Sequence, residues 1–387
     1  MTLHDHLYAP GPKRILALDG GGIRGALTLG YLQRMEDILL EQNGNDAGFT
    51  LSDYFDLIGG TSTGSIIAAC LAIGMKVADI KEKYFDLGGK IFGKKHSWWD
   101  VGPLYLFDKA HYDAKPIETE LQKLFGDITL GDDKIKTGLC IVAKRADTNS
   151  TWPLINHPGG KYFAGQYGSN KDILLWKAVR ASAAAPTYFI PQVIDVGGGL
   201  KEAAFVDGGM SMANNPALQL LMVATLSGFP FHWKTGAENL LIVSVGTGLG
   251  KMDRLPTDVT SSIGAQWAGQ IPDMLMQDAS WLNQIVLQWI SKSPIPWTID
   301  GEIGDMHGDL LATGTNNDGL ISYLRYNMWL TPDELTKVMN NPYTLAEAKY
   351  LEEMSHADNR FVLYDLGVKA GETQMNDSHF PLCFKIQ

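Results

Sequence analysis

The chain has 387 residues, 45% of them hydrophobic and 19% charged, which is typical of a folded globular protein rather than a disordered one. Its formal net charge of −11 excludes a broadly positive surface of the kind that attracts nucleic acid phosphates, so we expect no nucleic acid partner. Three widely spaced cysteines (Cys70, Cys140 and Cys383) match neither a disulfide framework nor a zinc site, and they suit a reducing compartment.

The N-terminal segment indicates where the protein works. Its first 14 residues are polar and include Pro10 and Pro12, so they contain no apolar signal-peptide core. No apolar run in the chain has the length of a transmembrane segment. We therefore expect a cytoplasmic protein that approaches any membrane lipid from water, as a peripheral protein. These patterns predict no oligomeric state.

Short apolar runs alternate with helical patterns over most of the chain. The runs that predict strands are residues 14–19, 56–60, 139–144 and 240–245, with a shorter one that leads into Asp207. Helical patterns begin near Gly25 and cover residues 65–73, 173–185 and 216–226. This alternation predicts a three-layer α/β/α sandwich with a mostly parallel central sheet that is covered on both faces.

The alternation does not continue to the end of the chain. It stops after about residue 250 and gives way to a tryptophan-rich stretch. We expect a catalytic core at 15–250, a helical insertion or cap at 251–330, and an extension at 331–387 that packs on the core.

The segment Gly60-Thr61-Ser62-Thr63-Gly64 is a G-x-S-x-G motif between a predicted strand and an apolar helix. In that context the motif is typical of a sharp turn that exposes a nucleophilic serine, because small residues let the backbone reverse without side-chain collisions. The helix N-terminus that follows favours developing negative charge. The structural alternative is a glycine-rich connection in which Ser62 only caps the helix.

Three consecutive glycines, Gly20, Gly21 and Gly22, follow the first predicted strand. Exposed backbone N–H groups in such a loop bind anions, either an oxyanion in acyl transfer or a nucleotide phosphate. With Gly25 they also satisfy G-x-G-x-x-G, a weak dinucleotide fingerprint. That fingerprint requires an acidic residue at the end of a second strand about 20 residues later, and here this position falls in a helix and polar loop. We favour the oxyanion interpretation, and a nucleotide-binding protein is the alternative.

The third motif is Asp207-Gly208-Gly209. An acidic residue at a strand end, followed by glycines, reaches into a site with little obstruction, although an ordinary Asx turn has the same sequence. A serine nucleophile needs a base. No late histidine lies in a glycine-framed turn at a strand end, which argues against a conventional Ser-His-Asp esterase. Such an esterase is the alternative, and its candidate bases are His232, His307, His356 and His379.

In this order the three motifs resemble those of the patatin-like phospholipases. Residues 19–25 match the family's D-G-G-G-x-R-G loop, 60–64 its serine motif and 207–209 its D-G-[GA] motif. The stretches 181–191 and 212–216 are also similar to family segments. The resemblance extends from residue 14 to about 250, and 323–330 resembles one further family segment.

The resemblance implies a fold related to α/β-hydrolases and a Ser62–Asp207 dyad that needs no histidine, metal or cofactor. The N–H groups of the three glycines would form the oxyanion hole. Burial would raise the pKa of Asp207 and make it a better base. The motif residues that support this arrangement are Asp19, Arg24, Gly25, Gly60, Gly64, Gly208 and Gly209, with Asp19 bracing the loop and Arg24 either fixing it or binding a lipid phosphate.

The implied activity is hydrolysis of carboxylic esters of phospholipids or other acyl lipids, of the phospholipase A or lysophospholipase type. A regulated effector phospholipase, switched on by a small ligand, is the alternative within the family. Lipid substrates need an apolar entry surface, and tryptophan-rich stretches at 96–107 and 267–297 are candidates. In the second, Trp281, Ile285 and Trp289 share one helix face, which either meets lipid or packs on the core.

Overall fold

The computed structural model describes residues 1–92, 113–186, 188–198, 202–251, 256–261, 264–300, 302–306, 309–311 and 319–386. The predicted tryptophan-rich stretch at 96–107 and the candidate His307 lie outside these ranges.

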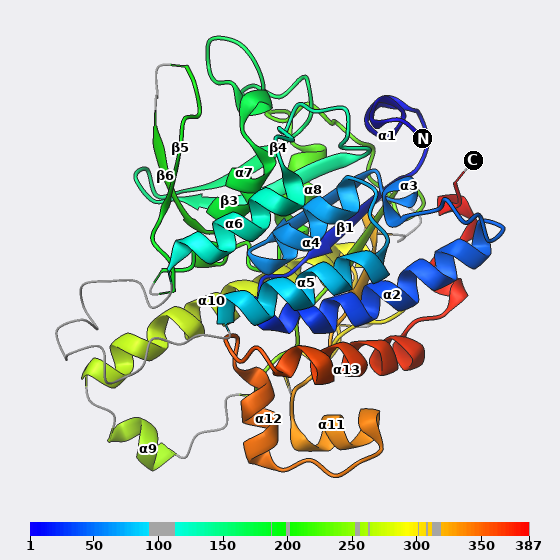
Figure 1. Ribbon diagram of the computed structural model, residues 1–387. Helices are drawn as coiled ribbons and strands as arrows, with labels where there is room; N and C mark the ends of the chain where they lie inside the picture. The colour runs from blue at the N-terminus through cyan, green and yellow to red at the C-terminus, as the bar shows by residue number, and fades with distance from the viewer. Residues whose placement is uncertain are drawn as a thin grey trace.

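In the part of the chain that the structure describes, nine strands form one sheet (Figure 1). The order is β5-β6-β3-β2-β1-β7-β9-β8, with β4 paired to β3. The strands are β1 (Lys13–Leu18), β2 (Leu57–Thr61), β3 (Gly138–Arg145), β4 (Ser150–Ile155), β5 (Gln192–Ile194), β6 (Ala203–Asp207), β7 (Leu240–Val245), β8 (Ser291–Lys292) and β9 (Ile321–Tyr326). The run β3-β2-β1-β7-β9-β8 is parallel, while β4, β5 and β6 pair antiparallel. The predicted mostly parallel sheet is confirmed.

Alternate residues of the central strand β1 enter two separate cores. Leu16 and Leu18 pack with α2 (Gly25–Gln42), α4 (Thr63–Ala72) and α13 (Asn359–Gln374), whereas Ile15 and Ala17 pack with α8 (Ala217–Thr225) and the end of α10 (Gly264–Ile290). Side chains of a strand alternate between the two faces of its sheet, so helices cover both faces and the α/β/α sandwich is confirmed. The other α-helices are α1 (Leu3–Tyr8), α3 (Leu51–Tyr54), α5 (Val77–Phe92), α6 (Ala114–Phe125), α7 (Leu175–Ser182), α9 (Pro256–Thr260), α11 (Pro332–Met339) and α12 (Leu345–Glu352).

The sheet continues beyond the predicted catalytic core. β9 falls inside the range 251–330 that the sequence sets apart as an insertion, yet it pairs in parallel with β7. Its sequence, ISYLRY, mixes polar and apolar residues and lacks the continuous apolar run that marks the other central strands. The division into core, insertion and extension stays a prediction.

None of the helices within the described ranges combines the length and apolar character needed to cross a membrane.

The C-terminal helix α13 crosses the first long helix, α2, at very short range. A Cβ atom on Gly367 would collide with the backbone oxygen of Leu27, and one on Gly30 would collide with the backbone of Tyr364. Backbone atoms inside packed helices cannot move aside cheaply, so both positions need glycine.

Gly367→Ala is therefore expected to lower the free energy of unfolding by about 2 kcal/mol or more, although alanine favours helix formation. Urea unfolding monitored by circular dichroism measures this change. Gly228→Ala is the control, because nothing lies within 4 Å of its added Cβ atom. Equal stability of the two variants would contradict the close crossing.

Candidate active site

Ser62 occupies the turn between β2 and α4, and its backbone is unusual. Its φ of 54° and ψ of −124° lie in a backbone region that residues other than glycine rarely adopt. A Cβ atom on Gly60 would meet the backbone of Gly64, and one on Gly64 would meet the carbonyl oxygens of Leu18 and Asp19. The sharp turn that the G-x-S-x-G motif predicts is thus present, and both glycines are required by close backbone contacts.

The sheet register brings Asp207 to this turn. Val142 of β3 pairs with Thr61, the last residue of β2, and the next residue, Ala143, pairs with Asp207, the last residue of β6. Because β4 occupies the opposite edge of β3, strands β2 and β6 lie end to end along the same edge. The residue after Thr61 is Ser62, so two strands far apart in the sequence end at the same point.

Ser62 and Asp207 are directly hydrogen-bonded. The Oγ of Ser62 donates to Oδ2 of Asp207 at 2.5 Å, and Oδ1 of Asp207 accepts the N–H of Gly209 at 2.7 Å. The Ser62 side chain makes no bond to the helix N-terminus that it precedes. The alternative role of Ser62 as a simple helix cap therefore does not fit the structure.

Burial changes the acidity of Asp207. Its carboxyl group is enclosed by protein, and the loss of hydration raises its pKa from 3.8 to about 6, against the opposing effect of the bonds from Ser62 and Gly209. A carboxylate with this pKa is ionised at neutral pH and is a stronger base than an exposed aspartate.

A second serine, which the sequence analysis did not single out, holds the turn in place. The hydroxyl of Ser182, at the end of α7, accepts the N–H of Ser62 at 2.9 Å and donates to the carbonyl oxygen of Val142 at 2.6 Å. Ser182 thereby holds the turn at residues 60–64, which we call the elbow, against β3. It lies in the stretch 181–191, whose similarity to a family segment is the only sequence signal at this position.

The glycine loop lies against Ser62. A Cβ atom on Gly20 would be 3.1 Å from the Cβ of Ser62. The N–H of Gly20, however, donates to the carbonyl oxygen of Asn214 at 3.1 Å. This differs from the prediction that three amides are free for an oxyanion. Among the described residues, the N–H groups of Gly21 and Gly22 have no hydrogen-bond acceptor, so those two amides can bind a ligand.

Comparison with known proteins places these motifs in a family. Residues 16–221 match the family described as patatin-like phospholipase. The chain belongs to this family. It is 30% identical over 244 residues to a cGAMP-activated phospholipase of Vibrio cholerae, an alignment that covers 60% of this chain and 64% of that protein. It is 31% identical over 260 residues to Patatin-like protein 2 of Arabidopsis thaliana, covering 60% and 59%.

The patatin-like chain therefore spans less than two thirds of the length of these relatives. Among solved structures, VipD from Legionella pneumophila matches with a TM-score of 0.36 and 14% identity over 92% of this chain and 67% of that one.

Asp19, which opens the patatin-like glycine loop, is committed to an ion pair. Arg325 of β9 binds both of its carboxylate oxygens, at 2.9 and 2.6 Å, and also donates to the Ser244 hydroxyl of β7 at 2.7 Å. The Thr247 hydroxyl donates to the Gly20 carbonyl oxygen at 3.0 Å. Both side chains hold the loop through these bonds, so the geometry fits the bracing role expected for Asp19. Arg325 was missed because an arginine within a strand gives no sequence signal of its distant partner.

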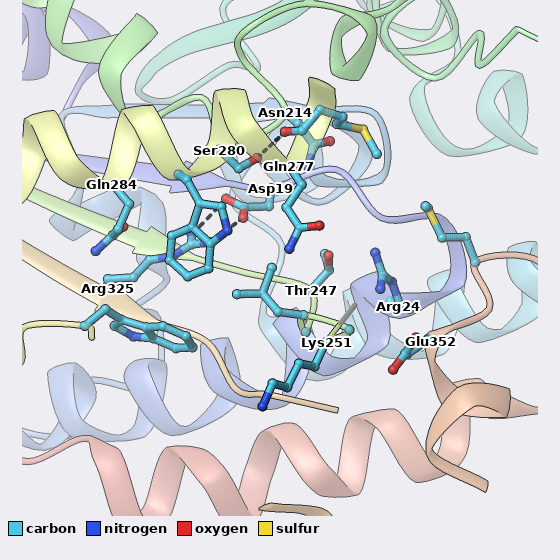
Figure 2. Close-up of a pocket in the computed structure, with 17 residues that line it drawn as sticks. Asp19, Arg24, Asn214, Thr247, Lys251, Gln277, Ser280, Gln284, Arg325 and Glu352 are labelled. Atoms are coloured by element: carbon cyan, nitrogen blue, oxygen red, sulfur yellow. Dashed lines mark hydrogen bonds and ion pairs between the residues drawn. The ribbon is translucent and has the colours of Figure 1, made fainter. Parts of the chain in front are cut away.

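A cavity of about 1080 Å³, counted with its solvent-open part, lies next to the glycine loop. Figure 2 shows Arg24 and Glu352 together at one side, while α10 contributes Ser280 and Gln284 at another. Ser62 and Asp207 do not line this cavity. Its link to them is Asn214, whose side-chain oxygen fits between Gly20 and Gly209. Arg24 thus faces a cavity beside the dyad. This position is compatible both with fixing the glycine loop and with binding a lipid phosphate.

The remaining motif glycines also mark close contacts. A Cβ atom on Gly25 would collide with the hydroxyl groups of Tyr84 and Thr63, and one on Gly208 would meet the Val142 carbonyl oxygen and the Thr61 methyl group.

Within the ranges that the structure describes, no histidine bonds to Ser62 or Asp207. His379 is buried and pairs instead with the Tyr326 hydroxyl, at 2.9 Å. The same part of the chain contains no cluster of three or more histidine, cysteine or acidic side chains arranged to hold a metal.

The raised pKa of Asp207 predicts a pH-dependent stability effect. The folded protein binds a proton at Asp207 more tightly than the unfolded chain does. The stability that this proton contributes is fully present below pH 3.8 and is lost as pH rises through about 6. Asparagine has the same shape but no charge, so Asp207→Asn should stabilise the protein by up to about 3 kcal/mol at pH 8, and by about 1–2 kcal/mol less at pH 5. Urea unfolding of both proteins at the two pH values measures this difference. A stability difference that does not change with pH would contradict the raised pKa.

Proposed function

We propose that this patatin-like protein is a serine lipid acyl hydrolase of the phospholipase A or lysophospholipase type, with Ser62 and Asp207 as its catalytic dyad. The observation that carries the proposal is the direct bond from the Ser62 hydroxyl to the buried Asp207 carboxylate. A carboxylate in this position can accept the proton that the nucleophile must lose.

The reaction proceeds in two halves. Ser62 Oγ attacks the ester carbonyl carbon while its proton passes to Asp207, and collapse of the tetrahedral intermediate expels the alcohol, which takes that proton. Asp207 then removes a proton from a water molecule, which attacks the acyl-enzyme. The second collapse releases the fatty acid and returns the proton to Ser62, so the enzyme ends unchanged.

The negative oxygen of each tetrahedral intermediate needs hydrogen-bond donors. The N–H groups of Gly21 and Gly22 supply them, since that of Gly20 is already bonded to Asn214. One such donor lowers the barrier by roughly 3 kcal/mol when it is fixed in place beforehand. The Asp19–Arg325 pair and Thr247 provide this rigidity.

Lipid esters are the substrate class that the family favours. The match to patatin-like phospholipases and the names of the relatives support it. The similarity to a cGAMP-activated phospholipase makes regulation by a small ligand the second candidate, which is supported if added cGAMP raises turnover.

Ser62→Ala and Asp207→Asn are each expected to lower kcat by at least about 10³-fold, because each removes a group that the first half-reaction requires. The assays are hydrolysis of a p-nitrophenyl butyrate solution and of phosphatidylcholine vesicles, with folding checked by circular dichroism. His379→Ala and His356→Ala are controls that should keep activity. Loss of turnover in a folded histidine variant would instead support a conventional Ser-His-Asp esterase.

The pH profile tests the base independently. Asp207 acts only when ionised, so kcat/KM should fall below a pH of about 6 and level off above it. The profile is measured with the soluble ester, where substrate ionisation does not interfere. A limb centred near pH 4 would mean that the essential carboxylate is not the buried one.

A further inference from the structure

The helix α10 has a polar buried face and an apolar exposed face, the reverse of an ordinary surface helix. Asn283, Gln284 and Gln288 are buried, together with Leu287. The exposed large apolar side chains are Ile271, Met274, Leu275, Leu282 and Trp289, which 3.6 residues per turn place on one side of the helix. We call these five residues the α10 apolar face. The N-terminal half of α10 projects beyond the neighbouring helices (Figure 1).

This face differs from the one that the sequence suggested. Of the predicted trio, Trp289 is 45% exposed, whereas Trp281 lies at the edge of the face, with its ring centroid 6.0 Å from that of Trp329. Leu275 and Leu282 are the most exposed members, at 63% and 59%. Moving leucine side chains with this exposure out of water lowers the free energy of the system.

Hydrogen bonds from the buried amides fix the orientation of α10. The Tyr323 hydroxyl donates to Gln284 at 2.8 Å. Gln288 donates to the carbonyl oxygens of Trp297 and Asp305, at 2.9 and 3.0 Å, and accepts the Trp297 N–H at 2.7 Å. Rotating the helix to bury its apolar face would break these bonds and leave buried amides unpaired, which is costly. The apolar face is therefore held toward the outside.

Two further bonds join α10 to the loop that follows Asp207. Asn283 donates to the carbonyl oxygens of Met212 and Asn215, at 2.7 and 3.0 Å, in the loop that begins with Asp207-Gly208-Gly209. Met210 and Met212 of that loop are each 47% exposed. Large exposed apolar side chains thus occur on α10 and on the segment that carries the proposed base.

We propose that the α10 apolar face, together with Met210 and Met212, docks on the surface of a phospholipid bilayer and presents the dyad to lipid. This proposal rests on the proposed function, because an enzyme that cleaves phospholipid must meet a substrate that stays in a membrane. Asp278 is the one charged group among the α10 side chains that the structure describes, and it is exposed on the same side of the helix as the α10 apolar face. Five large apolar side chains around one carboxylate suit a helix that lies in the interface, with the apolar side chains among the acyl chains and the carboxylate at the head groups.

The negative net charge of the chain distinguishes apolar insertion from electrostatic binding to anionic lipid. The chain carries a net charge of −11, so anionic lipid should not attract it. Apolar insertion should bind zwitterionic vesicles at least as well as anionic ones and should depend little on salt.

The test is flotation with vesicles of phosphatidylcholine alone and of phosphatidylcholine with one quarter phosphatidylglycerol. All proteins carry Ser62→Ala, so that the vesicles stay intact. Leu275→Gln and Leu282→Gln should each weaken binding by at least about fivefold, and the double variant by at least about twentyfold. Leu345→Gln on α12 is the matched control, since Leu345 is 61% exposed and belongs to no part of the docking face. It should bind like the parent.

Hydrolysis of p-nitrophenyl butyrate, measured without Ser62→Ala, separates docking from catalysis. The double variant should hydrolyse this soluble ester within about twofold of wild type while losing at least about tenfold in vesicle hydrolysis. No vesicle binding by the parent protein, or equal binding by the double variant, overturns the docking proposal. A dimer seen by light scattering that the double variant disrupts, without vesicle binding, assigns the face to a second copy of the chain and also overturns it. Absence of soluble-ester turnover in wild type counts against the proposed function alone.

Discussion

The site depends on one feature of the sheet, the shared edge of β3. Strand β2 ends where the antiparallel strand β6 arrives on the same edge, so Ser62 and Asp207 meet although 145 residues separate them in the sequence. Their bond needs no further side chain to bridge them, and the elbow glycines and Ser182 then fix the serine backbone. A shift of one residue in the β3–β6 register would turn Asp207 to the other face of the sheet.

The glycine loop has a separate support on the other side of β1. Arg325 and Thr247 belong to β9 and to the turn after β7, and both bind the start of the loop. A bidentate arginine–carboxylate pair is strong when it is removed from water, and it keeps a flexible glycine segment in one conformation. Catalysis by backbone amides requires that rigidity, since amides that must reorient during the reaction stabilise charge poorly.

Much of this arrangement could be predicted from the sequence, because the central strands are continuous apolar runs and the motif glycines occupy sites where the backbone passes within contact distance. β1, β2, β3 and β7 lie within one or two residues of their predicted limits. The partners that act from a distance could not be predicted. Arg325, Ser182 and Asn214 lie in stretches that resemble family segments, but no local pattern shows that they contact the glycine loop or the turn around Ser62. β9 was missed for the related reason that its polar residues, among them Arg325, are buried by specific bonds rather than by apolar character.

The central claim is that Ser62 is the nucleophile and that Asp207 activates it. Reaction with a fluorophosphonate that carries a long alkyl chain, followed by peptide mass spectrometry, tests this claim most directly, because the reagent bonds covalently to an activated serine. The account predicts a single adduct on Ser62, formed at least about 100-fold more slowly in Asp207→Asn. An adduct on another residue, or labelling of Ser62 at an unchanged rate in that variant, would contradict it.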